Sequence, residues 1–233
     1  MIPQEIEASS AQAVLAWAAE TFDPRFALVT SFAAEGVVLI DMLTKIHSRP
    51  RVLTIDTGRL PAETYALIEA IRERYGLTVE VLFPQTEAVE VMTREHGVNL
   101  FYRSVEARKF CCDVRKVEPL GRALVGLDAW ITGLRREQAI TRGDVGKVEL
   151  DDDHGGIAKV NPLADWSWDQ VWSYVRAHEL PYNALHDRGY PSIGCAPCTR
   201  AVEPDEDIRA GRWWWEQDGA AKECGLHRKG RHA

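Results

Sequence analysis

Four of the five cysteines in this chain form two short pairs, and the fifth stands alone near the C-terminus. The pairs are Cys111-Cys112 and Cys195-x-x-Cys198, and the remaining thiol is Cys224. Adjacent cysteines do not easily give both thiolates to one small tetrahedral zinc ion, whose common sequence unit is C-x(2–4)-C. An iron–sulfur cubane is larger and presents separate irons, so neighbouring thiolates can each bind one. The spacing therefore favours a cluster held by four cysteines over a zinc site, and it leaves Cys224 for chemistry.

Cys224 lies in a polar, glycine-containing segment, Lys222-Glu223-Cys224-Gly225-Leu226-His227, followed by Arg228 and Lys229. A lone cysteine is usually a small buried hydrophobe. Nearby positive charge, however, favours the thiolate, which is the nucleophilic form of the side chain. We therefore interpret Cys224 as a reactive thiol. Its position near the end of the sequence suggests a mobile arm that closes over a substrate and opens to a partner.

Basic residues lie in or beside the segments suspected of forming the site, although the chain as a whole has a net charge of −7. A single Arg or Lys is most often solvated surface, but guanidinium groups match the oxygens of phosphate or sulfate. As a group these residues predict an anion site: Arg115, Lys116, Arg135, Arg136, Arg142, Arg200, Arg209 and Arg212. Lys116 follows the first cysteine pair closely, so we expect it near both the cluster and an anionic substrate.

The elements that must position these side chains alternate through the first two thirds of the chain. Short apolar runs predict strands over residues 26–30, 51–55, 77–83 and 129–132. Amphipathic stretches predict helices over 35–47, 61–75, 86–95, part of 106–124, and from the capping box of Ser167 and Gln170 to a point before Pro181. Strands separated by helices of this length imply an α/β fold with a parallel, twisted sheet and right-handed crossovers.

Three polar segments directly follow the first, second and fourth predicted strands: Ser31 to Gly36, Asp56 to Arg59, and Gly133 to Glu137. Ligands of parallel sheets bind at the carboxyl ends of the strands, so these segments are the expected binding site. The first segment is rich in small residues and opens a helix, which suits backbone N–H groups that hold an anion. It is not a P-loop, because the G-x-x-x-x-G-K-[ST] pattern is absent.

Length and composition narrow the classes of protein. With 233 residues and 45% hydrophobic residues, the chain suits one compact domain, or one domain with a functional tail. The acidic balance gives no reason to expect nucleic acid or an anionic membrane as a partner. No apolar run is long enough to cross a bilayer, and the acidic N-terminus lacks the basic region of a signal peptide. We expect a cytoplasmic protein, where thiols stay reduced.

Taken together, the motifs resemble those of the assimilatory adenylyl-sulfate/phosphoadenylyl-sulfate reductase family, in particular its iron–sulfur members, which reduce adenosine 5′-phosphosulfate (APS). The matching segments run in order along nearly the whole chain: Ser31-Phe32, Ala34-Glu35, Ile55 to Leu60, Cys111-Cys112-x-x-Arg115-Lys116, Ile131-Thr132-Gly133-x-Arg135-Arg136, Asn161-Pro162-Leu163, Gly194 to Arg200, Gly211 to Trp215, and Glu223 to His227. The resemblance implies an adenine-nucleotide α-hydrolase-like, Rossmann-like sheet. It also implies a homo-oligomer and one non-redox 4Fe-4S cluster on the four paired cysteines.

The resemblance further implies a two-step reaction. The Cys224 thiolate attacks the sulfur of APS, expels AMP and leaves an enzyme S-sulfocysteine. Thioredoxin, or glutaredoxin in its place, then attacks the Cys224 sulfur and releases sulfite. The steps agree with general chemistry, since a thiolate is a strong nucleophile and the second step is analogous to disulfide exchange.

The resemblance assigns roles to individual residues. Cys224, Lys116 and His227 are implied to be catalytic. The residues implied to bind the substrate are Ser31, Ile55, Thr57 and Gly133 at the nucleotide, and Arg115, Lys116, Arg142, Arg209, Arg212 and His227 at or near the phosphosulfate. Many family members carry Ser-Gly where Ala33 stands and Asp where Gly36 stands, so phosphate contacts in the first loop are expected to use backbone N–H groups. The expected division is a nucleotide-binding α/β domain over residues 1–191 and a C-terminal segment over 192–233.

Three alternatives remain open from the sequence. The nearest is the same chemistry on 3′-phosphoadenosine 5′-phosphosulfate (PAPS), or on both substrates. A second is an ATP-pyrophosphatase-type transferase, although Ala33 to Gly36 do not supply its Ser-Gly-Gly-x-Asp-type loop. The third is a non-enzymatic module that binds a cluster or zinc, which would leave Cys224 without a function. Two other runs have simpler expectations: Asp151 to Asp153 form a solvated loop, and Trp213 to Trp215 pack the C-terminal segment onto the body.

Overall fold

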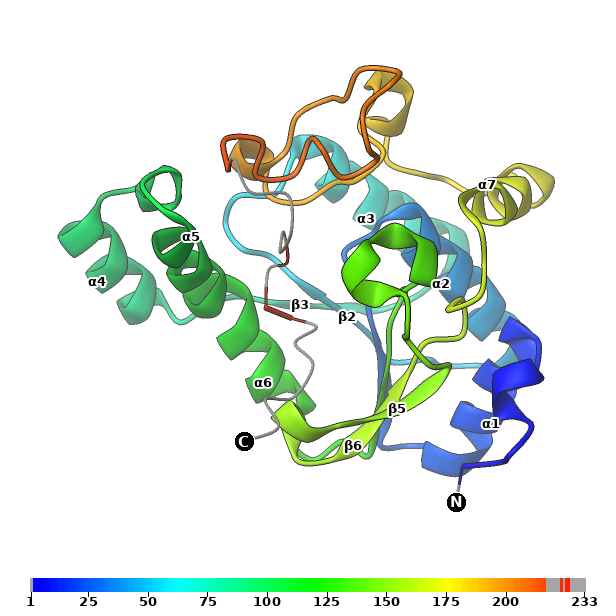
Figure 1. Cartoon of the computed structure of the whole chain (residues 1–233). Coiled ribbons are helices and arrows are strands. Elements are labelled where there is room, and N and C mark those ends of the chain that lie inside the picture. Colours follow the sequence, from blue (N-terminus) through cyan, green and yellow to red (C-terminus); the bar gives the residue numbers. More distant parts are fainter. Residues whose placement is uncertain (1, 217–222, 224, 227–233) are drawn as a thin grey trace.

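The computed structural model of the chain describes residues 2–216, 223, 225 and 226. Within them, the strands form one six-stranded sheet in the order β3-β2-β1-β4-β6-β5 (Figure 1). The strands are β1 (Phe26–Val29), β2 (Val52–Ile55), β3 (Val79–Leu82), β4 (Ala129–Ile131), β5 (Val148–Asp151) and β6 (Ile157–Val160). All neighbours pair in parallel except β5 and β6, which are antiparallel. The predicted parallel α/β sheet is confirmed, with one antiparallel edge strand added.

Helices cover both faces of the sheet (Figure 1). One side carries α1 (Ala11–Phe22), α2 (Ala34–Ile46), α3 (Ala62–Tyr75) and α7 (Trp168–Ala177). On the other side α6 (Glu118–Leu124) packs against the sheet, whereas α4 (Thr86–His96) and α5 (Val105–Cys112) lie farther from it. The capping box that predicted α7 is confirmed, because the Ser167 hydroxyl accepts from the backbone N–H of Gln170, whose side chain accepts from the N–H of Ser167.

Strand side chains alternate between two apolar cores, as the two-residue period of a strand requires. From β1, Phe26 and Leu28 join the core under α1, α2, α3 and α7, whereas Ala27 faces the core under α6. In β4, Ile131 faces the first core and Trp130 the second. Because both faces of these strands are buried, they read as continuous apolar runs, which is why the sequence revealed them.

The hairpin of β5 and β6 corrects one expectation. Asp151 was expected in a solvated loop, but it ends β5 and is buried. Its carboxylate accepts hydrogen bonds from Trp130 Nε1 (2.8 Å) and lies 2.9 Å from His154 Nδ1. Burial alone would raise the pKa of Asp151, but the contacts with His154, the charge of Lys159 and the Trp130 bond hold it below its ordinary value. The carboxylate thus anchors the edge of the sheet.

Helices α5 and α6 are joined by a π-helical stretch, Asp113–Val117, into one continuous helix. Pro119 explains the irregularity, because it has no N–H to donate to the carbonyl of Arg115 four residues earlier, and its ring crowds that carbonyl. A π turn changes the phase of the side chains and is frequent at functional sites. Here it carries Arg115 and Lys116.

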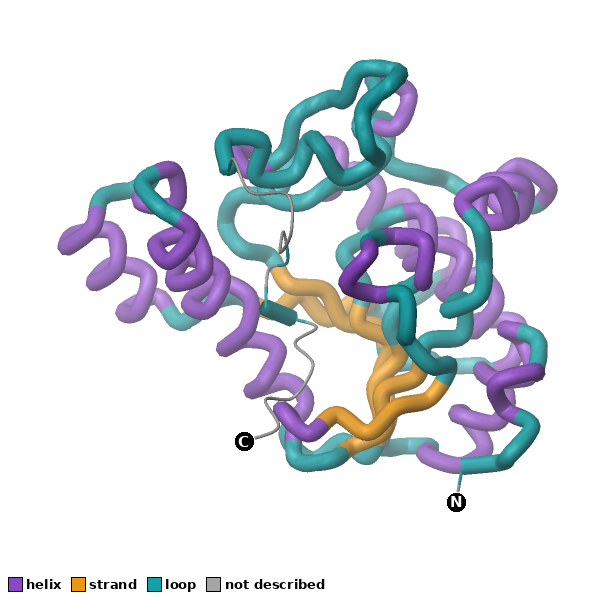
Figure 2. Tube along the Cα trace, in the orientation of Figure 1, coloured by secondary structure: helices purple, strands orange, loops and turns teal. Residues whose placement is uncertain are grey.

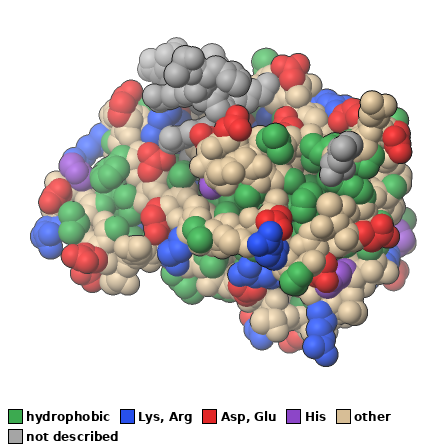
Figure 3. Space-filling view, turned by 90° about the horizontal axis from the view of Figure 1, so that it is seen from below, with side chains coloured by type: hydrophobic (Ala, Val, Ile, Leu, Met, Phe, Trp, Pro, Cys, Tyr) green, Lys and Arg blue, Asp and Glu red, His purple; other side chains and the backbone are tan. Residues whose placement is uncertain are grey.

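Two further features are the distribution of charge on the surface and the length of the helices. Acidic and basic side chains are interspersed on the face seen in Figure 3. No helix among the described residues combines the length and apolar character needed to cross a membrane.

Candidate active site

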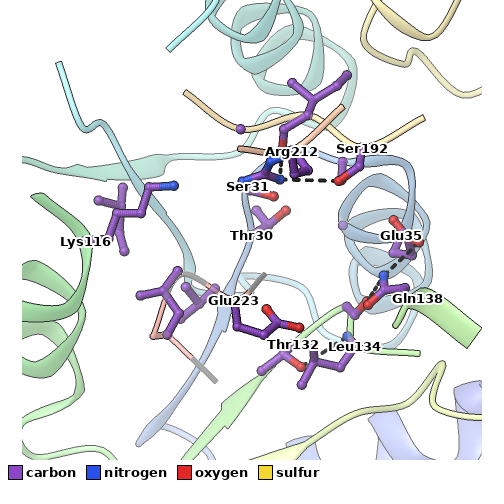
Figure 4. Close-up of a pocket in the computed structure, with 18 of the residues that line it drawn as sticks. Thr30, Ser31, Glu35, Lys116, Thr132, Leu134, Gln138, Ser192, Arg212 and Glu223 are labelled. Atoms are coloured by element: carbon purple, nitrogen blue, oxygen red, sulfur yellow. Dashed lines mark hydrogen bonds between the residues drawn. The ribbon is translucent and has the colours of Figure 1, made fainter. Parts of the chain in front are cut away.

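The main pocket lies at the carboxyl ends of β1, β2 and β4, where parallel sheets bind their ligands. Figure 2 shows loops and short helical turns from late in the chain lying above the sheet at this end. The walls of the main pocket include residues from all three polar segments singled out from the sequence, together with residues 191–194, 208–209 and 212–213. Figure 4 shows side chains from these separate segments pointing toward a common space.

A hydrogen bond between the backbone of Phe32 and the side chain of Thr30 fixes the loop after β1. Phe32 has a φ of +56° and is buried, and its N–H donates to Thr30 Oγ1 at 2.9 Å. A side chain at Gly36 would place its Cβ 1.9 Å from that same Oγ1. The close fit to Thr30 therefore requires glycine at this position of α2.

A buried ion pair forms the wall opposite Lys116 (Figure 4). Arg135 Nε donates to Glu35 Oε1 at 2.8 Å, and the Arg135 side chain is fully buried. Gln138 Nε2 also donates to Glu35 (2.9 Å) and to the carbonyl of Gly133 (3.1 Å). A buried arginine that is already neutralised adds rigidity to the wall more than it adds positive charge.

Among the described residues, the charged side chains that line the pocket are mostly basic: Lys116, Arg135, Arg142, Arg209 and Arg212, against Glu35 and Glu223. Arg212 Nη1 donates to Ser192 Oγ and to the carbonyl of Ile193, both at 3.3 Å, and its guanidinium stacks on Trp213. Arg142 makes a two-pronged contact with Glu223. This excess of positive charge suits an anionic ligand.

A second, smaller pocket adjoins the first and collects the paired cysteines. Its described lining contains Cys111, Cys112, Cys195 and Cys198, all buried and all free thiols, with Arg59, Phe101, Arg108, Arg115, Lys116 and Trp213 around them. Met92 and Leu100 belong to the same apolar cluster. No group of three His, Cys, Asp or Glu side chains among the described residues is arranged to hold a single metal ion.

The thiols of this pocket differ in acidity. Burial raises the pKa of Cys111, and burial with the charge of Cys195 raises that of Cys198 to about 12. Burial acts in the same direction on Cys195, but Lys116, a hydrogen bond from Thr57 and the charge of Arg212 together hold its pKa below the ordinary value. Thr57 Oγ1 lies 3.2 Å from Cys195 Sγ. The surroundings of Cys195 thus favour its thiolate, whereas those of Cys111 and Cys198 favour the neutral thiol.

The structure brings most of the predicted site residues together. The substrate residues that line the main pocket are Ser31, Ile55, Thr57, Lys116, Gly133, Arg142, Arg209 and Arg212. Arg115 lies instead at the thiol pocket, where Nη1 donates to the carbonyl of Thr57 at 2.6 Å. Cys224 and His227, expected to be catalytic, lie outside the described residues. Contact of any of these residues with a substrate stays a prediction.

Two of the basic residues singled out from the sequence are used elsewhere. Arg136 donates to Glu7 and to the carbonyl of Val145, and Arg200 pairs with Glu206 at 2.6 Å. Neither lines the main pocket as described. By contrast, the sequence assigned no role to Gln138 or Glu223, which do line it, and Glu35 was included only as a member of the segment Ser31 to Gly36. Only the motif around Cys224 hinted at Glu223, since the two residues are adjacent.

Lys116 and Trp213 line both pockets. Lys116 reaches its position from the π-helical stretch that follows the first cysteine pair. Trp213 is buried between the guanidinium groups of Arg108 (4.4 Å) and Arg212 (4.7 Å). Trp215 packs on Tyr102 and Trp214 is exposed, so the expectation that this run packs onto the body is confirmed for its first and third members.

Gly194 offers a test of the anion wall. A Cβ at this position would lie 2.4 Å from Nη2 of Arg212, the far end of a flexible side chain. We expect Gly194→Ala to displace the Arg212 guanidinium while the fold is kept. The affinity for an anionic ligand should then fall by about tenfold, which corresponds to about 1.4 kcal/mol. Gly121→Ala, where a Cβ meets nothing within 4 Å, is the control and should not change affinity. Equal affinities in both variants would remove Arg212 from the site.

Comparison with known proteins shows which family has this architecture. Residues 25–201 match the phosphoadenosine phosphosulfate reductase domain. The chain belongs to this family. The resemblance inferred from the motifs is thereby confirmed. The chain is 51% identical over 215 residues to the adenosine 5′-phosphosulfate reductase of Burkholderia cepacia, which covers 92% of this chain and 85% of the relative. The corresponding enzyme of Allochromatium vinosum is 52% identical over 200 residues, covering 86% and 77%.

Solved structures agree with this placement. A phosphoadenylyl-sulfate reductase from Candida auris, in a phosphate complex, superposes with a TM-score of 0.71 at 32% identity, over 87% of this chain and 98% of that one. An FMN adenylyltransferase from Candida glabrata superposes with a TM-score of 0.57 at 14% identity, over 94% and 76%. The second likeness concerns the fold alone, and it agrees with the expected Rossmann-like nucleotide fold.

Proposed function

We propose that the protein is an adenylyl-sulfate reductase that converts APS to sulfite and AMP in sulfate assimilation. Relatives about half identical to this chain over most of its length are named for this activity. The observation that carries the proposal furthest is the position of Lys116, which lines both the main pocket and the pocket of four thiols. The proposed reductant is a dithiol protein such as thioredoxin or glutaredoxin.

In this proposal, the strand-end segments hold the nucleotide, and the basic wall holds the phosphosulfate. Ser31, Ile55, Thr57 and Gly133 line the part of the pocket formed by strand ends. Lys116, Arg142, Arg209 and Arg212 offer the positive charge that two adjacent anionic groups require. Fixed cations in a partly buried pocket also stabilise the negative charge that grows on AMP as it leaves.

The chemistry balances in two steps. The Cys224 thiolate forms a bond to the sulfate sulfur while the bond from that sulfur to the bridging phosphate oxygen breaks, and the electron pair leaves with AMP. A thiolate of the reductant then attacks Cys224 Sγ, so that sulfite leaves with the electron pair of the broken S–S bond. The second thiol of the reductant resolves the mixed disulfide and returns Cys224 as a thiol. The reductant is thereby oxidised to a disulfide.

We further propose that Cys111, Cys112, Cys195 and Cys198 hold one 4Fe-4S cluster. Four buried free thiols around one small pocket fit such a group in ligand type and number, and thiols this buried are costly to ionise without a cation. Adjacent thiols such as Cys111 and Cys112 suit the separate irons of a cubane better than one tetrahedral zinc ion. When bound, the cluster would supply electrostatics near Lys116.

Iron content tests the ligand assignment. Anaerobically purified protein should carry about four iron and four sulfide atoms per chain, as one cubane requires. Cys195→Ala should lose them, because it removes one of the four proposed ligands. Cys224→Ser should keep them. A colourless, zinc-loaded protein, or an iron-loaded Cys195→Ala variant, would contradict the assignment.

Sulfite release tests the reaction as a whole. The protein is supplied with thioredoxin and either APS or PAPS, and sulfite and nucleotide products are quantified. Release of sulfite and AMP from APS supports the proposal. Equal turnover of PAPS would widen the substrate range, whereas no sulfite from either substrate in cluster-loaded protein would overturn it. Cytoplasmic location, a homo-oligomer and the division at residue 192 stay predictions.

A further inference from the structure

Glu223 places a carboxylate inside a wall of basic residues. Its Oε2 lies 2.7 Å from Arg142 Nη2 and 3.4 Å from Arg209 Nη2, and its Oε1 accepts from Arg142 Nε at 2.8 Å. Thr141 Oγ1 also donates to Oε1, at 3.2 Å. The Arg142 guanidinium therefore binds both oxygens of one carboxylate. A guanidinium group binds two oxygens of a sulfate or phosphate in the same geometry.

The backbone of Glu223 is held as well as its side chain. Arg108 Nη1 donates to the Glu223 carbonyl, while Nε and Nη2 of Arg108 bind the carboxylate of Glu216 at 2.8 and 3.0 Å. Arg108 is buried on α5, one turn before the first cysteine pair, and stacks on Trp213. The main chain directly before Cys224 is thus tied to the helix that carries two of the thiols.

The contacts of Glu223 lie within the pocket and not at the surface. The Arg142 and Arg209 side chains are 11% and 14% exposed, and that of Glu223 is 22% exposed. Burial would raise the pKa of Glu223, but Arg142, Arg209 and Thr141 hold it below its ordinary value, so the group is anionic at neutral pH. Figure 4 shows the Glu223 side chain extending into the space between the wall of Lys116 and that of Glu35 and Gln138.

We propose that Glu223 is a positioning residue whose carboxylate occupies the anion subsite of Arg142 and Arg209 until the substrate's phosphosulfate displaces it. The inference rests on the proposed function for the identity of that substrate. In this exchange one anion replaces another: the Glu223 carboxylate leaves Arg142 and Arg209, and a sulfate or phosphate group of the substrate binds them. The ion pair keeps Glu223, the residue before Cys224, at the pocket before the substrate arrives, and it offsets part of the positive charge of Arg142 and Arg209, which would otherwise attract small anions.

The exchange has a measurable consequence, because the substrate must compete with an internal anion. Removing the charge of Glu223 should therefore tighten the binding of anionic ligands and leave neutral ones unchanged. Glu223→Gln keeps the shape of the side chain and removes the competing charge. Glu206→Gln is the matched control, since Glu206 makes a similar pair with Arg200 in the same part of the chain but away from the pocket.

The test uses equilibrium titration in protein whose nucleophile is disabled by Cys224→Ser, so that APS is bound and not consumed. With Glu223→Gln added, affinity for APS should rise by about tenfold, equivalent to about 1.4 kcal/mol, and affinity for adenosine should stay the same. Glu206→Gln should change neither. Unchanged or weaker APS binding, or equal tightening for APS and adenosine, would overturn the proposal, since either result means that Glu223 does not compete with the anion.

A second arm is independent of the proposed function. The midpoint of thermal unfolding, Tm, is compared in sodium sulfate and in sodium chloride at matched ionic strength, with Cys224 intact. Sulfate should raise the Tm of Glu223→Gln more than that of the native chain or of Glu206→Gln, because ligand binding to the folded state stabilises it. Equal shifts would overturn the role of Glu223. If neither the native chain nor the variants bound APS, while sulfate still raised the Tm of Glu223→Gln more than the others, the proposed function would be wrong. The anion subsite of Arg142 and Arg209 would still be supported.

Discussion

Replacing Cys224 by serine is expected to abolish sulfite release while substrate binding and the cluster are kept. A serine hydroxyl is hardly ionised at neutral pH, so the nucleophile of the first step is lost. The loss in kcat should reach at least about a thousandfold, the order found when a catalytic nucleophile is removed from a site that keeps its other groups. The measurement is turnover of APS with thioredoxin, alongside equilibrium binding of APS.

The cysteines of the thiol pocket provide the control for this variant. Cys224→Ser should retain its iron and its visible colour, because the four cysteines that line that pocket are enough to ligate one cubane. Cys195→Ala should lose both. If Cys224→Ser lost its iron, the division between four ligands and one nucleophile would be wrong.

Lys116→Ala is expected to keep the fold and the iron and to lose about a hundredfold to a thousandfold in kcat. The lysine lines both pockets, and its charge helps to hold the pKa of Cys195 down. Removing a fixed charge aimed at developing negative charge costs rates of this order. Since the same charge binds the ground state, KM for APS should rise as well. Steady-state kinetics with iron analysis of the same preparation gives both values.

Lys109→Ala is the matched control for Lys116→Ala. Lys109 is an exposed lysine on α5 and lines neither pocket as described. Its removal should change turnover by less than twofold or so, because exposed charges are screened by water and salt. Equal turnover of Lys116→Ala and Lys109→Ala would remove Lys116 from the active site.

The central part of the fold could be predicted because its strands are buried on both faces. The runs at 26–30 and 51–55 are continuous and apolar, and they became β1 and β2. Residues 148–160 gave no such signal. β6 contains Lys159, whose stem is buried while its charge lies 5.5 Å over the Trp130 ring, and β5 ends in Asp151. Polar residues on an edge hairpin look like a loop until their tertiary partners are known.

The location of the site was also predictable, because parallel strands have their carboxyl ends at the same edge of the sheet. Thr57 and Gly133 lie in segments that were singled out on that ground, and they line one pocket. The Arg142–Glu223 and Arg135–Glu35 pairs were not foreseen. Each joins residues 81 or more positions apart, and no local period reports such a contact. A basic residue in a site segment looks the same in the sequence whether it awaits a ligand or already has a carboxylate partner.

Intact mass spectrometry of anaerobically purified protein mixed with APS, in the absence of reductant, tests the central claim most directly. The account predicts one added sulfonate per chain, mapped to Cys224, released as sulfite when thioredoxin is added and absent from the Cys224→Ser variant. No adduct on cluster-loaded protein, or an adduct on any other residue, would contradict the proposed mechanism.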